Sequence, residues 1–344
     1  MNPHALSMIV SSLALGTITT LSSYHWILAW IGLEINTLAI IPLMTKPNHP
    51  RAIEAATKYF LMQATASAMI LFSSTANAFT TGEWNITSST NNLSTMFMSI
   101  ALLTKIGVAP FHFWLPEVMQ GLSIKTGLLL STWQKLAPLA LLVQLQPSIN
   151  SNLMMLTAML SMMVGGWGGI NQTQTRKVLA YSSIAHLGWM VAVLKFLPQL
   201  TILNFILYVT VSSTLFLLFI QLNTKNIFEL STSWPKMPAL TALSILTLLS
   251  LGGLPPLTGF IPKWMITNEL IKQHLTLFSL VILLMTLLTL FFYLQLAYSM
   301  SLVLAPNTSF SQTTWPLSKK NTMATLISLS MLLLPLTPGI LAIT

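Results

Sequence analysis

Cysteine and aspartate are both absent from this chain of 344 residues, and charged residues of any kind make up only 6% of it. Without cysteine, the chain can form no disulfide, thiolate metal site or cysteine-ligated iron–sulfur cluster. Six histidines are present, but no two of them have the HxxxH spacing that places two ligands on one helix face. We therefore expect neither a metal nor a redox cofactor on this chain.

Acidic residues are scarce: six glutamates stand against fifteen lysines and arginines, and the formal charge is +9. Nucleic-acid binding would need those bases clustered on a polar face, and they are scattered. Hydrophobic residues make up 54% of the chain, and the mean hydropathy is +0.75. This composition predicts a polytopic membrane protein. Apolar sequence begins within a few residues of Met1, so we expect no removable signal or transit peptide.

Apolar stretches that could cross a bilayer recur along the whole chain. A helix needs ~20 residues to cross a hydrocarbon core of ~30 Å. The expected fold is an all-α membrane protein with about eleven transmembrane helices, spanning residues 3–21, 25–44, 55–79, 94–113, 122–145, 152–170, 176–196, 199–222, 239–272, 276–304 and 322–342.

Basic residues are distributed unevenly between the two sets of loops. The loops that follow the odd-numbered spans hold only two basic residues, Lys195 and Lys272. The loops that follow the even-numbered spans hold ten: Lys46, Arg51, Lys58, Lys125, Arg176, Lys177, Lys225, Lys236, Lys319 and Lys320. In membrane proteins, loops rich in lysine and arginine stay on the side of the membrane where the protein is synthesised. The N-terminus is therefore expected on the side of synthesis, and the C-terminus on the other side.

Four ionisable residues fall inside expected spans. Glu34 is central in the second span, and Lys105, Lys135 and Lys263 lie in the fourth, fifth and ninth. A charge at the bilayer centre costs ~2.5 to 3.5 kcal/mol on insertion scales, so each side chain must face the bundle interior. A structural ion pair with Glu34 would neutralise one lysine and leave the other two without a carboxylate partner. Because desolvation favours a neutral amine, a row of such lysines predicts a proton relay.

Two of the expected spans contain helix-breaking residues beside a buried lysine. In LLTKIGVAPFHFWLPEV (102–118), Gly107 and Pro110 follow Lys105, and in the ninth span LGGLPPLTG (251–259) precedes Lys263. Proline removes a backbone donor and clashes with the preceding turn. Non-helical backbone at this depth survives only inside protein or beside water. A single proline kink is common, but two breaks that each adjoin a lysine favour a polar pathway.

The broken spans are the fourth and the ninth, which suggests an internal repeat. Residues 1–145 and 150–304 would be two five-helix units, inverted because five is odd, followed by a last helix at 322–344 in a single membrane domain. Under this pairing Glu34 corresponds to His186, in YSSIAHLGWM (181–190). A lone intramembrane histidine is more often a packing residue, but its ordinary pKa near neutrality makes His186 a relay candidate.

Several of these stretches carry a resemblance to a known family. KIGVAPFHFWLPEVMQG, STWQKLAP, YSSIAHLGWM and LGGLPPLTGFIPKW resemble, in the same order, the subunit 2 family of NADH:ubiquinone oxidoreductase from animal mitochondria. Members are antiporter-like membrane subunits of respiratory complex I. The resemblance covers essentially the whole chain. It implies a fourteen-helix fold that has lost its first three helices.

The resemblance also assigns roles to individual residues. It implies that Glu34 is the acidic partner, that Lys105 and Lys263 are the lysines of the two broken helices, and that Lys135 connects them. His186 and His112 are weaker matches. The predicted function is a proton relay in the membrane arm, in the mitochondrial inner membrane with the N-terminus on the matrix side.

The resemblance also implies where the redox chemistry takes place. NADH, FMN, iron–sulfur clusters and ubiquinone are then expected on partner subunits. The expected partners are other membrane-arm subunits, further antiporter-like subunits among them, together with membrane lipids, for which cardiolipin is a candidate.

Two other functions stay open at this point. A free-standing cation/proton antiporter would share the fold, but should hold more acidic residues at depth than the single Glu34. A scaffold that has lost transport would have no reason to keep three buried lysines.

Overall fold

The computed structural model describes residues 2–46, 49–87, 91–234, 237–301 and 324–332. It divides into two compact units, Met1–Leu160 and Ser161–Thr344, with the boundary inside one helix.

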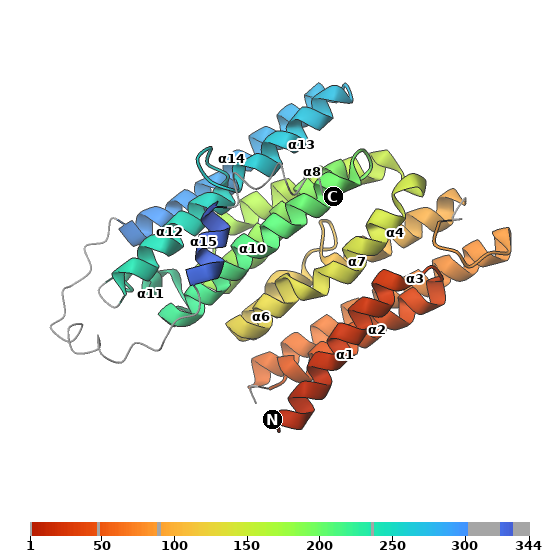
Figure 1. Cartoon of the computed structure of the whole chain (residues 1–344), viewed down its shortest axis with the longest axis horizontal. Coiled ribbons are helices and arrows are strands. Elements are labelled where there is room, and N and C mark those ends of the chain that lie inside the picture. Colours follow the sequence, from red (N-terminus) through yellow and green to blue (C-terminus); the bar gives the residue numbers. More distant parts are fainter. Residues whose placement is uncertain (1, 47–48, 88–90, 235–236, 302–323, 333–344) are drawn as a thin grey trace. The chain divides into compact units, whose positions relative to one another are not determined.

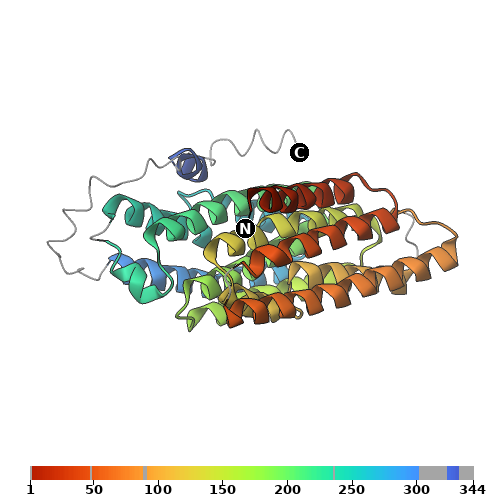
Figure 2. The ribbon, with the colours of Figure 1, turned by 90° about the horizontal axis from the view of Figure 1, so that it is seen from below.

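The first unit is all-helical in its described residues, and its helices run side by side (Figures 1 and 2). Helix α1 packs along α2, and α3 packs against α2, α4 and α5. Gly16 and Gly32 allow the close approach of α1 and α2, because a Cβ at either would lie under 3 Å from the other helix. The elements are α1 (Pro3–Ser22), α2 (Trp26–Met44), α3 (Pro50–Thr81), α4 (Asn92–Ile106), α5 (Trp114–Gly121), α6 (Ile124–Ser131), α7 (Trp133–Gln144), a 3₁₀ turn (Gln146–Ser148) and the first half of α8 (Ser151–Ile170).

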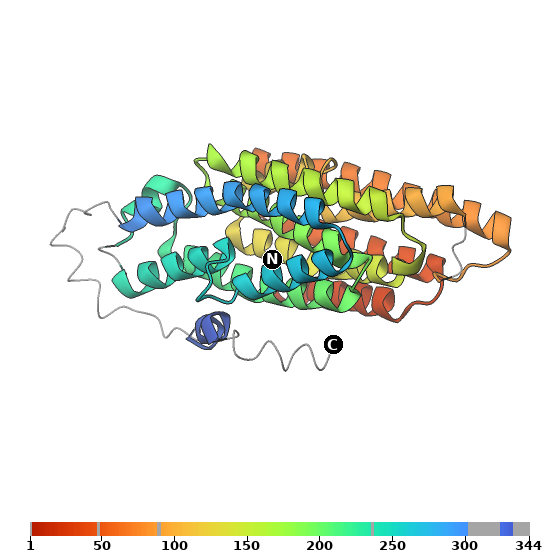
Figure 3. The ribbon, with the colours of Figure 1, turned by 90° about the horizontal axis from the view of Figure 1, so that it is seen from above.

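The second unit is also all-helical in its described residues (Figure 3). Helix α10 packs against α9, α12 and α13, and α14 packs against α12. The elements are the second half of α8, α9 (Thr175–Leu194), α10 (Pro198–Leu222), α11 (Ile227–Ser231), α12 (Pro238–Gly252), α13 (Phe260–Lys272), α14 (Thr276–Ser301) and α15 (Ala324–Leu332).

Seven spans among the described residues are long and apolar enough to cross a membrane, which makes this a multi-pass membrane protein. A helix suits that setting because it satisfies its own backbone hydrogen bonds. The expected count of eleven stays a prediction, because two of the other helices are shorter and the span at 322–342 lies largely outside the described residues. The seven are Pro3–Ser22, Trp26–Met44, Ile124–Gln144, Ser151–Ile170, Thr175–Leu194, Pro198–Leu222 and Thr276–Ser301.

The span expected over 122–145 is confirmed as Ile124–Gln144. Within it the helix is divided into α6 and α7 at Thr132, where φ is −112° and ψ is −68°. Pro138 weakens the ladder on the C-terminal side, because it has no N–H to donate to the carbonyl of Gln134. Lys58, expected in a loop, lies in the third turn of α3.

Candidate functional site

The first interruption separates α4 from α5. Helix α4 ends at Ile106, Gly107 adopts a left-handed conformation with φ of +86°, and α5 begins at Trp114. The N–H groups of Gly107 and Val108 both donate to the carbonyl of Leu103. Glycine is the residue that adopts such a conformation without strain. Other carbonyls of the last turn of α4 are left for side chains to bond.

Two buried side chains satisfy those carbonyls. Trp114 Nε1 donates to the carbonyl of Thr104 at 3.1 Å, and Gln63 Nε2, from α3, donates to the carbonyl of Lys105 at 3.2 Å. Unbonded carbonyls at the end of a helix are costly away from water. These two bonds therefore hold the broken end of α4 within the protein interior.

Lys105 and Lys135 line one small cavity in the first unit. Lys105 lies in the last turn of α4 and is 5% exposed, and Lys135 lies in the first turn of α7 and is 2% exposed. The space open to the centre of a water molecule is ≈ 10 Å³, which is room for about one water. The other polar side chains on its wall are Asn36, Thr37, Tyr59, Gln63 and Gln134.

Glu34 acts on this cavity without a direct bond to a lysine. Its charge interacts with Lys105, but no ion pair joins these two described residues. Lys105 Nζ and Glu34 Oε2 are both buried without a hydrogen-bond partner. The C-terminal end of α4 carries partial negative charge from its carbonyls, which favours the Lys105 ammonium.

The second interruption separates α12 from α13. Helix α12 ends at Gly252, Gly253 has φ of +80°, and α13 begins at Phe260. Lys263 Nζ donates to the carbonyl of Gly252 at 2.7 Å. The predicted interruptions near Pro110 and Pro255 are thus both present in the described residues. Lys263, like Lys105, lies against the C-terminal end of the half-helix that precedes the break.

His186 and Lys263 come together in the second unit, where both line the same two small cavities. Asn204, Tyr208 and Ser250 complete the polar wall of one cavity. The ring of His186 lies 5.5 Å from that of Tyr208, centroid to centroid. An imidazole, a phenol and an amine thus line one small cavity.

His112 lies apart from the lysine cavity. It occupies the turn between α4 and α5, is 6% exposed, and has its ring 4.2 Å from that of Phe113. It is not among the described residues that line the cavity of Lys105 and Lys135.

The polar residues on the cavity walls belong to no motif that stands out in the sequence. In α3, Tyr59 and Gln63 are four residues apart, a spacing that places both on one helix face. In α10, Asn204 and Tyr208 have the same spacing. Gln134 Nε2 also ties α7 to α2 through the carbonyl of Asn36. A search for polar pairs at this spacing within apolar spans would have found the first two pairs.

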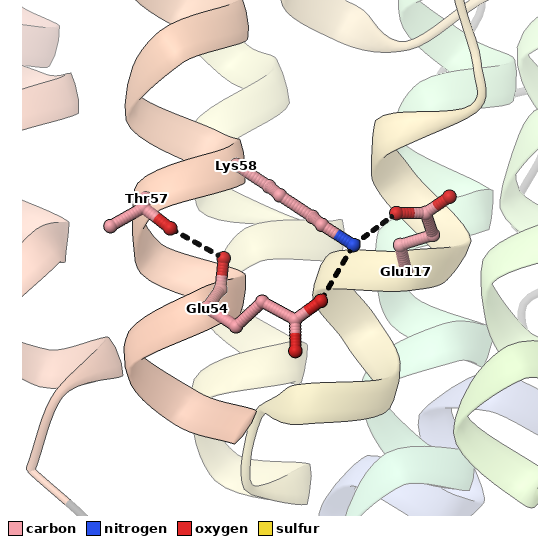
Figure 4. A network of polar contacts seen from close by, with 4 residues as sticks. All are labelled: Glu54, Thr57, Lys58 and Glu117. Atoms are coloured by element: carbon pink, nitrogen blue, oxygen red, sulfur yellow. Dashed lines mark hydrogen bonds and ion pairs between the residues drawn. The ribbon is translucent and has the colours of Figure 1, made fainter. Parts of the chain in front are cut away.

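An exposed charge network joins α3 to α5 (Figure 4). Lys58 Nζ lies 2.8 Å from a carboxylate oxygen of Glu54 and 2.7 Å from one of Glu117, and all three side chains are 42% exposed or more. Thr57 Oγ1 donates to the carbonyl of Glu54. Exposed ion pairs contribute about 0–1 kcal/mol, so this network adds little to stability.

Among the residues that the structure describes, no three His, Asp or Glu side chains gather as a metal site would require.

A multi-pass helical chain with an interrupted helix beside a lysine in each compact unit defines an antiporter-like membrane protein. The family described as "NADH:quinone oxidoreductase/Mrp antiporter, TM" matches residues 23–289, and the one described as "NADH dehydrogenase subunit 2 C-terminus" matches residues 290–341. The chain belongs to the NADH-ubiquinone oxidoreductase chain 2 family. Chain 2 of Aquarana catesbeiana is 56% identical over 99% of both chains, and that of Xenopus laevis is 56% identical over 98% of this chain and 99% of the other.

Solved structures give the same result for the fold. A chain of respiratory complex I from Thermus thermophilus matches with a TM-score of 0.84 and 26% identity, covering 97% of this chain and 80% of that one. A chain of the Mrp complex from Dietzia matches with a TM-score of 0.78 and 17% identity, and the match covers 97% of this chain and 74% of that one. The two chains share the fold. This chain is thus a membrane subunit of NADH:ubiquinone oxidoreductase, antiporter-like and involved in proton translocation.

Proposed function

We propose that this chain carries a proton relay driven by electron transfer elsewhere in complex I. Protonation of one lysine would repel the proton of its neighbour, and Glu34 would bias the balance through its charge on Lys105. The proposed relay residues are Glu34, Lys105, Lys135, Lys263 and His186, with His112 a weaker candidate because it lies away from the lysine cavity.

The observation that carries this proposal is the shared cavity of Lys105 and Lys135. Two lysines 5% or less exposed line one small cavity, and Lys105 Nζ has no hydrogen-bond partner among the described residues. A purely structural lysine at this depth would be paired, since an unpaired buried charge is expensive. A titrating amine can remain buried without such a partner, because it can lose its charge.

The redox steps are assigned to partner subunits. This chain has no cysteine and no dinucleotide fingerprint, so NADH, FMN, the iron–sulfur clusters and ubiquinone would bind elsewhere in the complex. Its partners would be other membrane-arm subunits, further antiporter-like ones among them, and membrane lipids such as cardiolipin.

The finer architecture belongs to the same proposal. Two inverted five-helix repeats with a last helix would span the mitochondrial inner membrane, the N-terminus facing the matrix. The interrupted helices α4–α5 and α12–α13 support the repeat, because each unit has one. Relatives named as chain 2 of NADH-ubiquinone oxidoreductase support the location.

The proton-to-electron ratio of the complex in reconstituted vesicles tests this function against a scaffold role. We expect Lys105→Met to lower the ratio or the coupled rate severalfold in a fully assembled complex. Lys125→Met, on an exposed lysine of the same unit, is the matched control and should behave as the unmodified enzyme. Normal values for both variants would overturn a relay through Lys105 and favour the scaffold function. A free-standing antiporter would instead exchange sodium or potassium for protons when purified alone.

A further inference from the structure

The proposed relay of the first unit has a gap that a direct proton transfer would have to cross. Glu34 and Lys105 interact through charge but form no ion pair. Proton transfer needs heavy atoms within hydrogen-bond reach, directly or through one water. The cavity has room for about one water. A further group that can both accept and donate a proton would shorten the path.

We propose that a buried tyrosine hydroxyl passes protons in each unit: Tyr59 between Glu34 and the cavity of Lys105 and Lys135, and Tyr208 between His186 and Lys263. This inference rests on the proposed relay function.

Tyr59 has the position that such a role needs. It is 2% exposed, lines the cavity with both lysines, and interacts electrostatically with Glu34. Its ring meets that of Trp114 edge-on, with centroids 5.7 Å apart and planes at 61°. Trp114 is itself fixed by its bond to the carbonyl of Thr104. The phenol is therefore held at the cavity wall.

Tyr208 has a corresponding position in the second unit. It is 4% exposed, its ring lies 5.5 Å from that of His186, and both line the cavity that Lys263 shares. Tyr59 is on α3 and Tyr208 on α10, which are the third helices of the two proposed repeats. The same residue type thus recurs on the same helix of each repeat, facing the lysine of the broken helix.

The step conserves protons and moves no electrons. A phenol oxygen accepts a hydrogen bond while its O–H donates another. A proton arriving on the oxygen from one neighbour is matched by loss of the original hydroxyl proton to the next. The tyrosine ends the cycle neutral, and no oxidant or co-reactant is required.

The test compares Tyr59→Phe and Tyr208→Phe in the assembled complex in vesicles. Phenylalanine keeps the ring and removes only the oxygen. Tyr24→Phe, on a side chain 83% exposed, is the matched control. We expect both buried variants to assemble, to reduce ubiquinone severalfold more slowly under coupled conditions, and to show a larger solvent deuterium isotope effect. A packing role would not raise the isotope effect.

The outcomes separate this inference from the function on which it rests. Normal turnover and a normal isotope effect in Tyr59→Phe and Tyr208→Phe, with Lys105→Met impaired, would overturn the tyrosine role and leave the lysine relay standing. Normal behaviour of Lys105→Met as well would overturn both. A lower amount of complex with normal turnover per complex would show that the hydroxyls serve packing only.

Discussion

At the scale of single residues, the broken helices show how a lysine can lie within a membrane protein without a carboxylate. Lys105 lies in the last turn of α4, and Lys263 donates to the last carbonyl of α12. A charge at a helix terminus gains typically 0.3–1 kcal/mol, whereas a lysine at the bilayer centre costs ~2.5 to 3.5 kcal/mol. The carbonyls thus offset part of the cost of a charged lysine.

Lys135 gives the sharpest test at this scale. Methionine at 135 keeps length and apolar packing but removes the titrating amine, so the complex should assemble and coupled ubiquinone reduction should fall severalfold or more. Arginine at 135 should also fail, because a guanidinium stays protonated. Both rates are measured in the assembled complex, with Lys125→Met as the control.

The arginine variant separates a relay from a structural charge. A structural role tolerates a permanent cation, whereas a relay must pass its proton on. Normal turnover and normal proton yield in Lys135→Arg would assign Lys135 to packing and move the relay elsewhere.

At the scale of elements, each break depends on a glycine in a left-handed conformation. Gly107 and Gly253 have φ of +86° and +80°, which costs other residues ~1–2 kcal/mol. Gly253 also leaves room for the neighbouring lysine, because a Cβ there would lie 2.8 Å from Lys263 Nζ. The conformation of Gly253 therefore determines both where α12 ends and where the Lys263 amine lies.

Adjacent glycines in this break offer a matched pair of variants. Gly253→Ala should displace Lys263 and lower coupled turnover, because alanine is strained at this φ and its methyl group meets the amine. Gly252→Ala should be tolerated, since a Cβ there meets only ordinary contacts with Tyr293 at 3.8 and 3.9 Å. Thermal stability and proton yield of the two assembled complexes are the measurements. Equal behaviour would contradict the assigned role of Gly253.

At the scale of the whole chain, isolated β-bridges bring loops of the same side together. His25 pairs with Asn85 in the first unit, and Gln174 pairs with Asn226 in the second. The second bridge lies beside Arg176, Lys177 and Lys225, all from loops expected on the basic side. Lys236, Lys319 and Lys320 lie outside the described residues.

Orientation can be measured on the intact membrane. We expect Lys46, Arg51 and Arg176 to be labelled from the matrix side, because basic loops remain on the side of synthesis; the same expectation holds for Lys320. Labelling of the loop at 83–94 should require access from the intermembrane space. Access to that loop from the matrix would reverse the assignment.

Obligate assembly is a second expectation at this scale. Only 22% of the apolar window of α1 is buried within the chain, and the match to the Thermus thermophilus chain covers 80% of that longer chain. Lipid or another subunit must then cover this apolar surface. We expect the isolated chain to be unstable in detergent, as judged by size-exclusion chromatography. A stable, monodisperse monomer would contradict this.

The amino-acid sequence by itself determined the membrane class, the two interrupted helices and the identity of the buried charges. These follow from composition and local chemistry: few charges, long apolar runs, and glycine and proline beside Lys105 and Lys263. Hydropathy did not reveal the break at Thr132, because the whole stretch Ile124–Gln144 is apolar enough to cross a membrane.

Only the tertiary structure decided which groups share a cavity. Tyr59, Lys105 and Lys135 come from separate helices, and so do His186, Tyr208 and Lys263. When a helix is apolar on every side, its sequence does not indicate which face packs against the other helices. Packing between helices sets that rotation. It brought Tyr59 and Tyr208 onto the walls of the lysine cavities and left His112 out of the lining of the first.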